Sequence, residues 1–595
     1  MSYSDASVNL ALIGNCNYQA LIDDEARVQW LCWPRFDSSF VFGGLVDGER
    51  GGEYSIRPRD DGYATAQEYL PNTNIVKTYF RSAGGDFEVL DFAPRFRLYE
   101  RFYKPTMLVR RIRRISGRPV IRVTCKPTYD YGRVALAPKT ASNHIRWKLD
   151  DAHLRLTTNA SLSYIQESRP FLLDDDVYLV LTWGQPLEAP LVETCDNFYR
   201  RTRRYWETWV KHGSLPDSYQ AEVIRSALAL KLHQFEDTGA ITAATTTSIP
   251  EHPGSGRNWD YRYCWLRDAC FTLGALRRIG QFEEMEQFVQ YLTNLAEDSD
   301  EVLQPVYGIT GERNLTETTL DHLAGWRGDG PVRAGNAAFG QLQHDVYGEM
   351  IAAIAPLFLD LRFRDVAGAH STALIRHLLA RIDATLMEPD VGPWEKRAEQ
   401  RLHTFSLLMH WAGARAAARV GERTGDASLA EDAELLARRA RDIIEDRCWR
   451  PKLGFYADAV DSDEPDASLL LMVNLGFVDP RHERAASHVL ETGKRLSAGD
   501  HLLYRYRHHD GIGTTEASFT VCGFWYAEAL ARVGRVEQAR EVFEALVSHA
   551  NHVGLLSEDL DPKTGAQWGN FPQTYSHVGL INAAFAINPV SGLMV

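Results

Sequence analysis

One short stretch of the sequence concentrates the side chains that bind sugars. Residues 257–268 read RNWDYRYCWLRD and hold four aromatic rings, three guanidiniums and two carboxylates just before a helical pattern begins. Flat rings offer apolar surface to the C–H faces of a pyranose, and guanidiniums and carboxylates fix its hydroxyl groups through charge-assisted hydrogen bonds. The stretch therefore predicts a carbohydrate pocket, with a buried ion-pair cluster at a helix start as the alternative.

Two carboxyl groups elsewhere in the chain have a setting that suits an acid and a base, with a solvated loop carboxylate as the alternative for each. Hydrolysis of an acetal with inversion needs an acid for the leaving oxygen and a base for water, roughly 6.5 to 9.5 Å apart. Glu395 follows Trp394 in a Gly/Pro-marked loop between two predicted helices, where an apolar wall would keep a general acid protonated. Glu558 lies in a similar loop and is the candidate base. Asp559 and Asp561 compete with it, although Asp561 opens a turn signature, Asp-Pro-Lys-Thr-Gly.

The amino-acid composition argues against some classes of binding partner. The 65 basic and 79 acidic residues give a formal net charge of −14, without a Lys or Arg run that would follow a phosphate backbone, so we expect no nucleic acid partner. The charge also opposes an anionic membrane surface, whereas a neutral polyol is indifferent to it. The start of the chain lacks a signal-peptide pattern, and no stretch reaches the ~18 apolar residues of a membrane span. We expect a soluble, cytoplasmic protein without a membrane partner.

The cysteines and histidines do not predict a metal site. The eight cysteines are scattered, without a C-x-x-C pair or a histidine at zinc-ligand spacing. Small buried thiols in a reducing compartment account for them. His508, His509 and Asp510 come nearest to a metal cluster, but adjacent residues on a loop point in different directions.

Two hydrophobic periods divide the chain. Up to about residue 193 it reads as short strands, several of which alternate apolar with polar residues. The predicted strands include residues 29–33, 75–80, 87–92, 107–115, 120–124 and 177–183. An antiparallel β-sandwich accounts for them. Because 595 residues exceed a single core, we divide the chain into a β-sandwich (1–195), a linker segment rich in Arg, Tyr and Trp (196–216) and a helical catalytic domain (217–595).

The second half of the chain has a helical period of 3.6. About twelve amphipathic runs begin near residues 218, 266, 281, 339, 371, 402, 429, 467, 482, 518, 536 and 575. Long loops that carry Trp, Asp, Glu and Arg separate several of them. The pattern predicts six helical hairpins closed into an (α/α)6 barrel, with its chemistry in the loops at one end. The period alone does not distinguish this barrel from an open solenoid, which would more often be a binding scaffold.

From end to end the chain resembles glycoside hydrolase family 15, in particular the bacterial and archaeal members that have an N-terminal β-sandwich. The matching stretches are residues 13–16, 30–38, 257–268, 330–338, 394–395, 505–506, 524–525, 557–558 and 569–573. The family's architecture, a β-sandwich followed by an (α/α)6 barrel, agrees with the two periods. The resemblance implies exo-hydrolysis of α-glucosidic bonds with inversion and without a cofactor.

The resemblance also assigns roles to individual residues. It implies that Glu395 is the general acid and Glu558 the general base. The residues implied to bind the terminal glucose are Tyr261, Trp265, Arg267, Asp268, Trp394 and Arg505. The loop at residues 331–336 and the loop that begins at Asn570 are expected at the same end of the barrel.

Some residues depart from the family pattern, and these departures help to distinguish between possible substrates. Pro393, Lys396 and Ala398 stand where many relatives have an aliphatic residue, Val and Gly, and a lysine turned toward the acid would lower its pKa. Fungal-type glucoamylases usually place a second acid after the catalytic one, where this chain has Lys396. The resemblance therefore favours an α,α-trehalase. A glucoamylase or an isomalto-oligosaccharide glucohydrolase, acting on α-1,4 or α-1,6 glucans, is the alternative.

Two further classes of function remain open. Phosphorolysis on the same barrel would not need a second carboxylate, so the presence of Glu558 argues against it. A sugar-binding protein that has lost catalysis would not need both Glu395 and Glu558. The sequence leaves self-association open, and it does not predict whether the β-sandwich contributes to the pocket.

Overall fold

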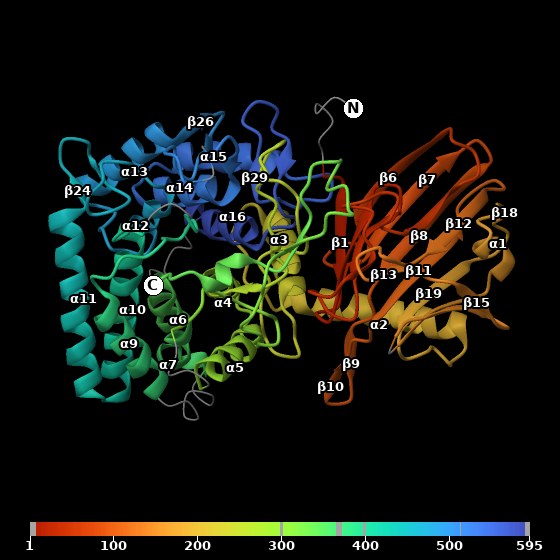
Figure 1. The fold of residues 1–595 in the computed structure, drawn as a ribbon, viewed down its shortest axis with the longest axis horizontal. Coiled ribbons are helices and arrows are strands. Elements are labelled where there is room, and N and C mark those ends of the chain that lie inside the picture. Colours follow the sequence, from red (N-terminus) through yellow and green to blue (C-terminus); the bar gives the residue numbers. More distant parts are fainter. Residues whose placement is uncertain are drawn as a thin grey trace.

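The computed structural model describes residues 8–588 except 151, 298–301, 364–371, 397–399, 512 and 514. A strand-rich domain built from the first part of the chain stands beside a helical domain built from the second (Figure 1). All strand pairs within the three larger sheets of the first domain are antiparallel, as the sequence predicts.

Three sheets make up most of the strand-rich domain. One contains β1 (Leu10–Gly14), β2 (Gln19–Asp23), β3 (Val28–Cys32) and β4 (Phe40–Phe42). The largest has the order β15 (Pro138–Thr140), β16 (His144–Lys148), β17 (His153–Thr158), β19 (Val177–Trp183), β11 (Met107–Arg114), β8 (Gly85–Phe92), β7 (Val76–Ser82), β6 (Tyr63–Tyr69). The third contains β18 (Phe171–Leu172), β12 (Val120–Lys126) and β5 (Glu53–Pro58). Buried and half-exposed residues alternate through the first part of β7, which is the pattern of a sheet with one face in the core.

A single long helix occupies most of the segment predicted as a linker. Helix α2 (Leu191–Lys211) buries one face that includes Trp206 and Trp209, and it contacts β9 (Phe96–Leu98) and β19 of the strand-rich domain. Trp209 Nε1 also donates a hydrogen bond to Glu284 Oε1 of the helical domain at 3.1 Å. The Arg, Tyr and Trp residues of this segment therefore belong to an amphipathic helix that bridges the two domains. The division at residues 195 and 217 stays a prediction.

The helices of the second domain begin close to the predicted positions. Their bounds are α3 (Gln220–His233), α4 (Leu266–Arg278), α5 (Glu283–Glu297), α6 (Asp345–Ile354), α7 (Pro356–Leu359), α9 (Ala373–Thr385), α10 (Thr404–Thr424), α11 (Ala427–Arg447), α12 (Leu471–Asn474), α13 (Glu483–Leu496), α14 (Thr520–Arg532), α15 (Val536–Ser548) and α16 (Thr574–Ile587). The run predicted near residue 339 is a 3-10 turn, η2 (Ala337–Gly340), ahead of α6. Among the described residues, no helix combines the length and apolarity needed to cross a bilayer.

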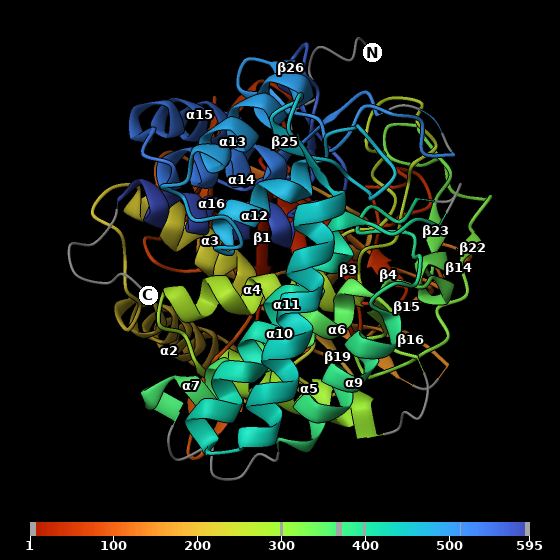
Figure 2. The same ribbon diagram turned by 90° about the vertical axis from the view of Figure 1, so that its left-hand side faces the viewer.

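The inner helices of this domain contact one another in a closed order; Figure 2 shows the domain from the side on which α10 and α11 lie in front. Helix α4 contacts α6, α6 contacts α10, and α10 contacts η4 (Ala467–Leu470), which leads into α12. Both η4 and α12 contact α14, α14 contacts α16, and α16 returns to α4. Glycines allow the close crossing of α6 and α10, because a Cβ atom on Gly348 would lie 1.9 Å from the Met409 carbonyl oxygen. These contacts bring the last inner helix back to the first, whereas the six helical hairpins of an (α/α)6 barrel stay a prediction.

Candidate active site

One cavity brings the predicted site residues together. It holds about 790 Å³ of empty space, counting its open mouth, which lies within the ~300–1,000 Å³ of small-molecule sites. Its wall includes all eight candidates, namely Tyr261, Trp265, Arg267, Asp268, Trp394, Glu395, Arg505 and Glu558. Several wall residues precede or begin the inner helices α4, α14 and α16, so the cavity opens at one end of the ring. The wall residues come from the helical half of the chain, none of them from the sandwich.

Two donors reach the carboxyl group of Glu395. Trp265 Nε1 donates a hydrogen bond to Oε1 at 2.6 Å, and Arg267 Nη2 lies 3.8 Å from the same oxygen. Burial raises the pKa of Glu395 above its ordinary value, while Arg267 and the Trp265 N–H favour the charged form. The side chain keeps 25% of its surface exposed, so it is open to the cavity. A carboxyl group with a raised pKa and an open face suits the role of a general acid.

The backbone of Glu395 has a conformation that residues with a Cβ atom rarely adopt. Its φ is 57°, in the left-handed region, which costs roughly 1–2 kcal/mol. The turn is held by the Glu395 N–H, which donates to the Gly392 carbonyl at 3.4 Å, and by Gln341 Nε2, which donates to the Glu395 carbonyl at 3.4 Å. Strain of this kind persists where the surroundings over-determine a functional geometry. Here it accompanies a carboxyl group directed at the indole of Trp265.

Glu558 is more deeply buried, with 1% of its surface exposed. Its Oε2 accepts a hydrogen bond from the Asn570 N–H at 3.3 Å, whereas Oε1 forms no hydrogen bond with another described residue. Burial, and then the nearby Glu251 carboxylate, raise the pKa of Glu558 to about 8, and the Arg505 guanidinium opposes this shift. The Asn570 N–H thus fixes one oxygen of the carboxyl group, and the Tyr261 hydroxyl also favours its charged form.

The two carboxylates that compete with Glu558 in the sequence are placed differently. Asp561 accepts hydrogen bonds from the Lys563 N–H and the Thr564 hydroxyl, both at 2.8 Å, and so forms the turn that its sequence predicts. Asp559 is buried in the short strand β29 (Asp559–Leu560), which pairs with β28 (Ser518–Phe519). It is not part of the cavity wall.

A set of charged residues surrounds Glu558. Glu251 accepts hydrogen bonds from Arg505 Nη2 at 2.6 Å and from Trp259 Nε1 at 3.2 Å. Arg257 Nη2 donates to Asp510 Oδ1 at 2.9 Å, and Arg257 Nη1 lies 3.9 Å from Glu251 Oε2. The cavity wall includes these four charged residues and Trp259. Arg505 therefore reaches the predicted site, where its guanidinium is bound to a second carboxylate.

Sequence reasoning missed two of these acidic residues. Glu251 lies only six positions before the 257–268 stretch, between two prolines, and this proximity was the one available signal. Asp510 was considered only as a metal ligand, but it accepts a hydrogen bond from the Tyr506 hydroxyl at 2.5 Å in addition to its contact with Arg257. His508 stacks on the Tyr506 ring at 4.8 Å. Within the described part of the chain, no three His, Cys, Asp or Glu side chains group to hold a metal ion.

Arg267 and Asp268 lie side by side in the first turn of α4. Arg267 Nη1 donates hydrogen bonds to Gln343 Oε1 at 2.7 Å and to Asp345 Oδ2 at 3.0 Å. Burial raises the pKa of Asp268 to about 7, although Arg267 opposes the shift. Because Arg267 is bound on its far side by α6, its second nitrogen faces Glu395 and the cavity.

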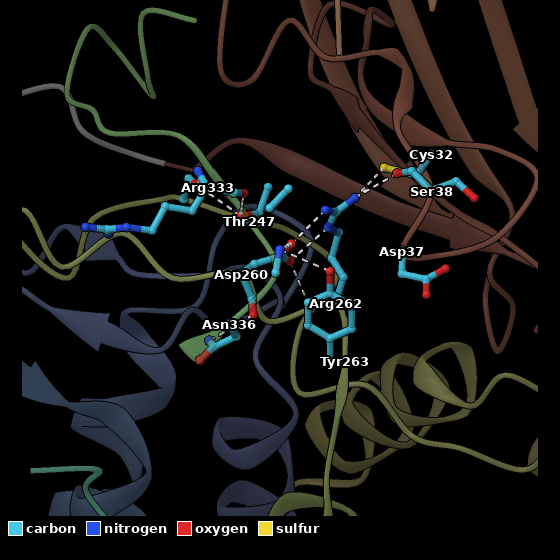
Figure 3. A network of polar contacts seen from close by, with 12 residues as sticks. Cys32, Asp37, Ser38, Thr247, Asp260, Arg262, Tyr263, Arg333 and Asn336 are labelled. Atoms are coloured by element: carbon cyan, nitrogen blue, oxygen red, sulfur yellow. Dashed lines mark hydrogen bonds and ion pairs between the residues drawn. The ribbon is translucent and has the colours of Figure 1, made fainter. Parts of the chain in front are cut away.

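The sandwich domain holds the segment that carries Tyr261. Arg262 is fully buried, and its Nε and Nη2 donate to the two carboxylate oxygens of Asp260 at 2.9 and 2.7 Å. Nη1 donates to the Ser38 carbonyl at 2.8 Å, and Nη2 also donates to the Tyr131 hydroxyl at 3.1 Å. Figure 3 shows this guanidinium extending from the site segment toward the sandwich. The sandwich therefore supports the cavity from behind without lining it.

The two loops expected at this end of the ring contribute in different ways. Asn336 lines the cavity, and its Nδ2 donates a hydrogen bond to the Asp260 carbonyl at 3.2 Å. Asn570 does not line it, but its Nδ2 donates to the Trp259 carbonyl at 2.9 Å. Its backbone N–H reaches Glu558, so this loop holds the carboxylate in place.

Lys396, which departs from the family pattern, and Trp394 flank Glu395, the predicted acid, and are each held by contacts of their own. Lys396 Nζ lies 3.4 Å from Asp458 Oδ2 and 5.1 Å from the centre of the Tyr506 ring, so the ammonium group is bound away from the acid. Trp394 Nε1 donates to both carboxylate oxygens of Asp466, at 2.9 and 2.8 Å, which fixes its indole beside Pro393 in the cavity wall. Ala398 lies outside the described residues.

Two family models together match most of the chain. The model of glycosyl hydrolases family 15 matches residues 217–585, and a model described as trehalase-like, N-terminal, matches residues 5–159. A trehalase from Mycobacterium tuberculosis is 33% identical over 96% of this chain and 88% of its own length. A trehalase from Thermoplasma volcanium is 30% identical over 98% of this chain and 95% of its own.

A solved structure has the same fold. It is a bacterial glucoamylase complexed with acarbose, and the match has a TM-score of 0.68 at 14% sequence identity, over 97% of this chain and 93% of the glucoamylase. This likeness confirms the predicted order of an antiparallel strand domain followed by a helical domain.

Proposed function

This chain belongs to glycosyl hydrolases family 15, and on that premise we propose that it is an α,α-trehalase that hydrolyses its substrate with inversion and releases β-glucose. The two relatives named above, both trehalases, span almost the whole chain, which supports this substrate. The observation that carries the chemistry is that Glu395 and Glu558, from loops far apart in sequence, line one cavity with different partners.

In the proposed reaction Glu395 donates its proton to the oxygen atom between the two glucose rings. The bond from that oxygen to the attacked C1 breaks, and the leaving glucose keeps the proton. Glu395 is left as a carboxylate, which the Trp265 N–H at 2.6 Å and the Arg267 guanidinium at 3.8 Å stabilise.

Glu558 is the proposed base, and it acts from its ionised form, whose fraction grows as pH rises toward its pKa of about 8. It removes one proton from a water molecule while the water oxygen bonds to C1 on the face opposite the leaving group. Its Oε1, which has no partner among the described residues, is the oxygen available for that proton. Attack from the opposite face converts the α configuration at C1 into β, so one ring leaves as β-glucose.

The cavity wall supplies groups for the attacked glucose. Tyr261 and Trp265 meet edge to face, with ring centres 5.2 Å apart, and offer an apolar wall. We propose that Arg267 and Asp268 bind its hydroxyl groups on one side and Arg505 on the other. Trp394 is proposed to pack against the substrate beside the acid.

Proton NMR of the anomeric region tests substrate and stereochemistry together. Trehalose hydrolysed with inversion should yield equal initial amounts of β-glucose and α-glucose, because only one of the two rings is attacked. Early α-glucose alone would show retention and overturn the roles of Glu395 and Glu558. Cleavage of maltose or isomaltose without cleavage of trehalose would replace the trehalase proposal by the glucoamylase or isomalto-oligosaccharide alternative.

The Glu558→Gln variant is the matched control for that experiment. It removes the base with little change in shape, so turnover should fall by roughly 10³ or more while trehalose binding stays measurable by calorimetry. Unchanged turnover would remove Glu558 from the mechanism. Glucose phosphate formed only in the presence of phosphate would instead indicate phosphorolysis.

We also propose that the enzyme acts in the cytoplasm. All eight cysteines are free thiols and seven are buried, which fits a reducing compartment.

A further inference from the structure

Helix α6 carries a buried pair of carboxyl groups beneath Arg267. Asp345 and Glu349 are four residues apart, so they lie on one face of the helix. Both are buried, with 0% and 1% of their surfaces exposed. Asp345 Oδ2 accepts the hydrogen bond from Arg267 at 3.0 Å. Asp345 Oδ1 and both oxygens of Glu349 form no hydrogen bond with a donor among the described residues.

Among the residues that the structure describes, Arg267 is the positively charged group that faces Glu349. The groups that face it are Arg267, Asp268 and Cys270 of α4, Tyr575 of α16 and Asp345 of its own helix. His344 and His410 lie beside Asp345, and burial lowers the pKa of both, to about 4 for His410. Burial, then Asp345, raise the pKa of Glu349 well above its ordinary value.

Water has little access to this pair. Every residue from Asp345 to Ile351 is buried, because Gly348 lets α6 press against the backbone of α10 at Met409. A buried carboxylate without a donor is costly, and a second one beside it is more so. One proton placed between the two groups satisfies both, since a protonated carboxyl group donates to a carboxylate.

We propose that Glu349 is a positioning residue that remains a neutral carboxylic acid and donates a hydrogen bond to Oδ1 of Asp345, so that Asp345 holds Arg267 on α6 and away from the proposed acid Glu395. This rests on the proposed function, because it assumes that Glu395 is the acid. The hydrogen bond satisfies one oxygen of Asp345 and leaves the other, Oδ2, to bind Arg267. Arg267 Nη2 then stays 3.8 Å from Glu395 and does not form a close ion pair with it.

Removing the hydrogen-bond donor at Glu349 would change the pKa of Glu395 indirectly, through Asp345 and then Arg267. Oδ1 of Asp345 would be buried without a donor, so Asp345 would take up a proton or turn away from Arg267. The released guanidinium would approach Glu395, whose pKa would fall because a positive charge favours the carboxylate. The acid would then be ionised over a wider range of pH.

The Glu349→Gln and Glu349→Leu variants separate these roles. Gln keeps a neutral donor at nearly the same position, so kcat on trehalose should stay within about threefold of the wild type, with an unchanged alkaline limb of kcat/KM. Leu removes the donor, so kcat should fall about tenfold or more, and the alkaline limb should move to lower pH. The proposal is wrong if the Gln variant loses as much activity as the Leu variant, or if the alkaline limb of the Leu variant does not move.

Thermal unfolding as a function of pH tests the proton without any substrate. A carboxyl group whose pKa is higher in the folded than in the unfolded state loses stabilisation as pH rises above about 4.3, and Gln does not titrate. The Tm of Glu349→Gln minus that of the wild type should therefore increase as pH rises from about 4.5 to about 8. The opposite trend would show that Glu349 is ionised and would overturn the proposal. A wild type that is inactive on trehalose but follows the expected trend would refute the proposed function and leave Glu349 neutral.

Discussion

Replacing Trp265 with Phe should weaken the acid by a predictable amount. The indole N–H donates the 2.6 Å hydrogen bond to Glu395 Oε1, and it favours the carboxylate over the neutral acid. Phe keeps an aromatic ring in the cavity wall but has no donor. The pKa of Glu395 should therefore rise.

The size of the shift follows from that one bond. A hydrogen bond to a charged group contributes about 1.5–3 kcal/mol, and one pKa unit corresponds to about 1.4 kcal/mol, so the pKa should rise by about one to two units. Since Glu395 must be protonated to act, the alkaline limb of kcat/KM should move to higher pH by that amount. The carboxylate that forms in the transition state also loses its donor, so kcat should fall about tenfold.

The assay is initial-rate hydrolysis of trehalose across the pH range, with Trp394→Phe as the control. Trp394 also lines the cavity, but its N–H binds Asp466 and not the acid, so its replacement should leave the alkaline limb in place. An alkaline limb that stays fixed in Trp265→Phe, or moves to lower pH, would refute the assignment of that limb to Glu395.

Two further variants test the base and the domain contact. Glu251→Gln removes the negative charge that raises the pKa of Glu558, so the base should ionise at lower pH and the acid limb of kcat/KM should move down by about one unit; a pH profile that shifts upward would contradict this. Tyr131→Phe removes the hydroxyl that accepts from Arg262 at 3.1 Å, so the free energy of unfolding should fall by about 1–2 kcal/mol. Denaturant unfolding measures that loss, and equal stability would mean that the contact contributes nothing.

The parts of the fold that the sequence predicts are those with one buried face. The period predicts the helical runs where, as in α13 and α15, a helix buries a single stripe of side chains. Strand β6 was not among the predicted strands, because it is an edge strand whose residues are mostly half-exposed or exposed. The run near residue 467 is only a 3-10 turn followed by one helical turn, which a period cannot distinguish from the start of a longer helix.

The site was predictable only where residues are close in sequence or match a family. The 257–268 stretch was visible from its composition, whereas Glu395 and Glu558 were selected through the resemblance. Glu251 and Arg505, which share the 2.6 Å hydrogen bond, are 254 positions apart. A contact over that separation depends on how the ring of helices closes, and no local pattern encodes it. For the same reason the sequence did not reveal that Asp345 lies behind Arg267.

The charged contacts between the two domains affect whether either domain would be stable without the other. Arg95 of the strand domain binds Glu236 beyond α3 at 2.8 Å, and Arg262 enters the strand domain from the site segment. Arg95 and Arg262 are both fully buried. A helical domain cut from the chain would keep Glu236 without its guanidinium and would expose Arg262 with its neighbours gone. Separating the two halves would therefore leave buried charges without partners in both, and we expect the helical half alone to unfold more easily than the full chain.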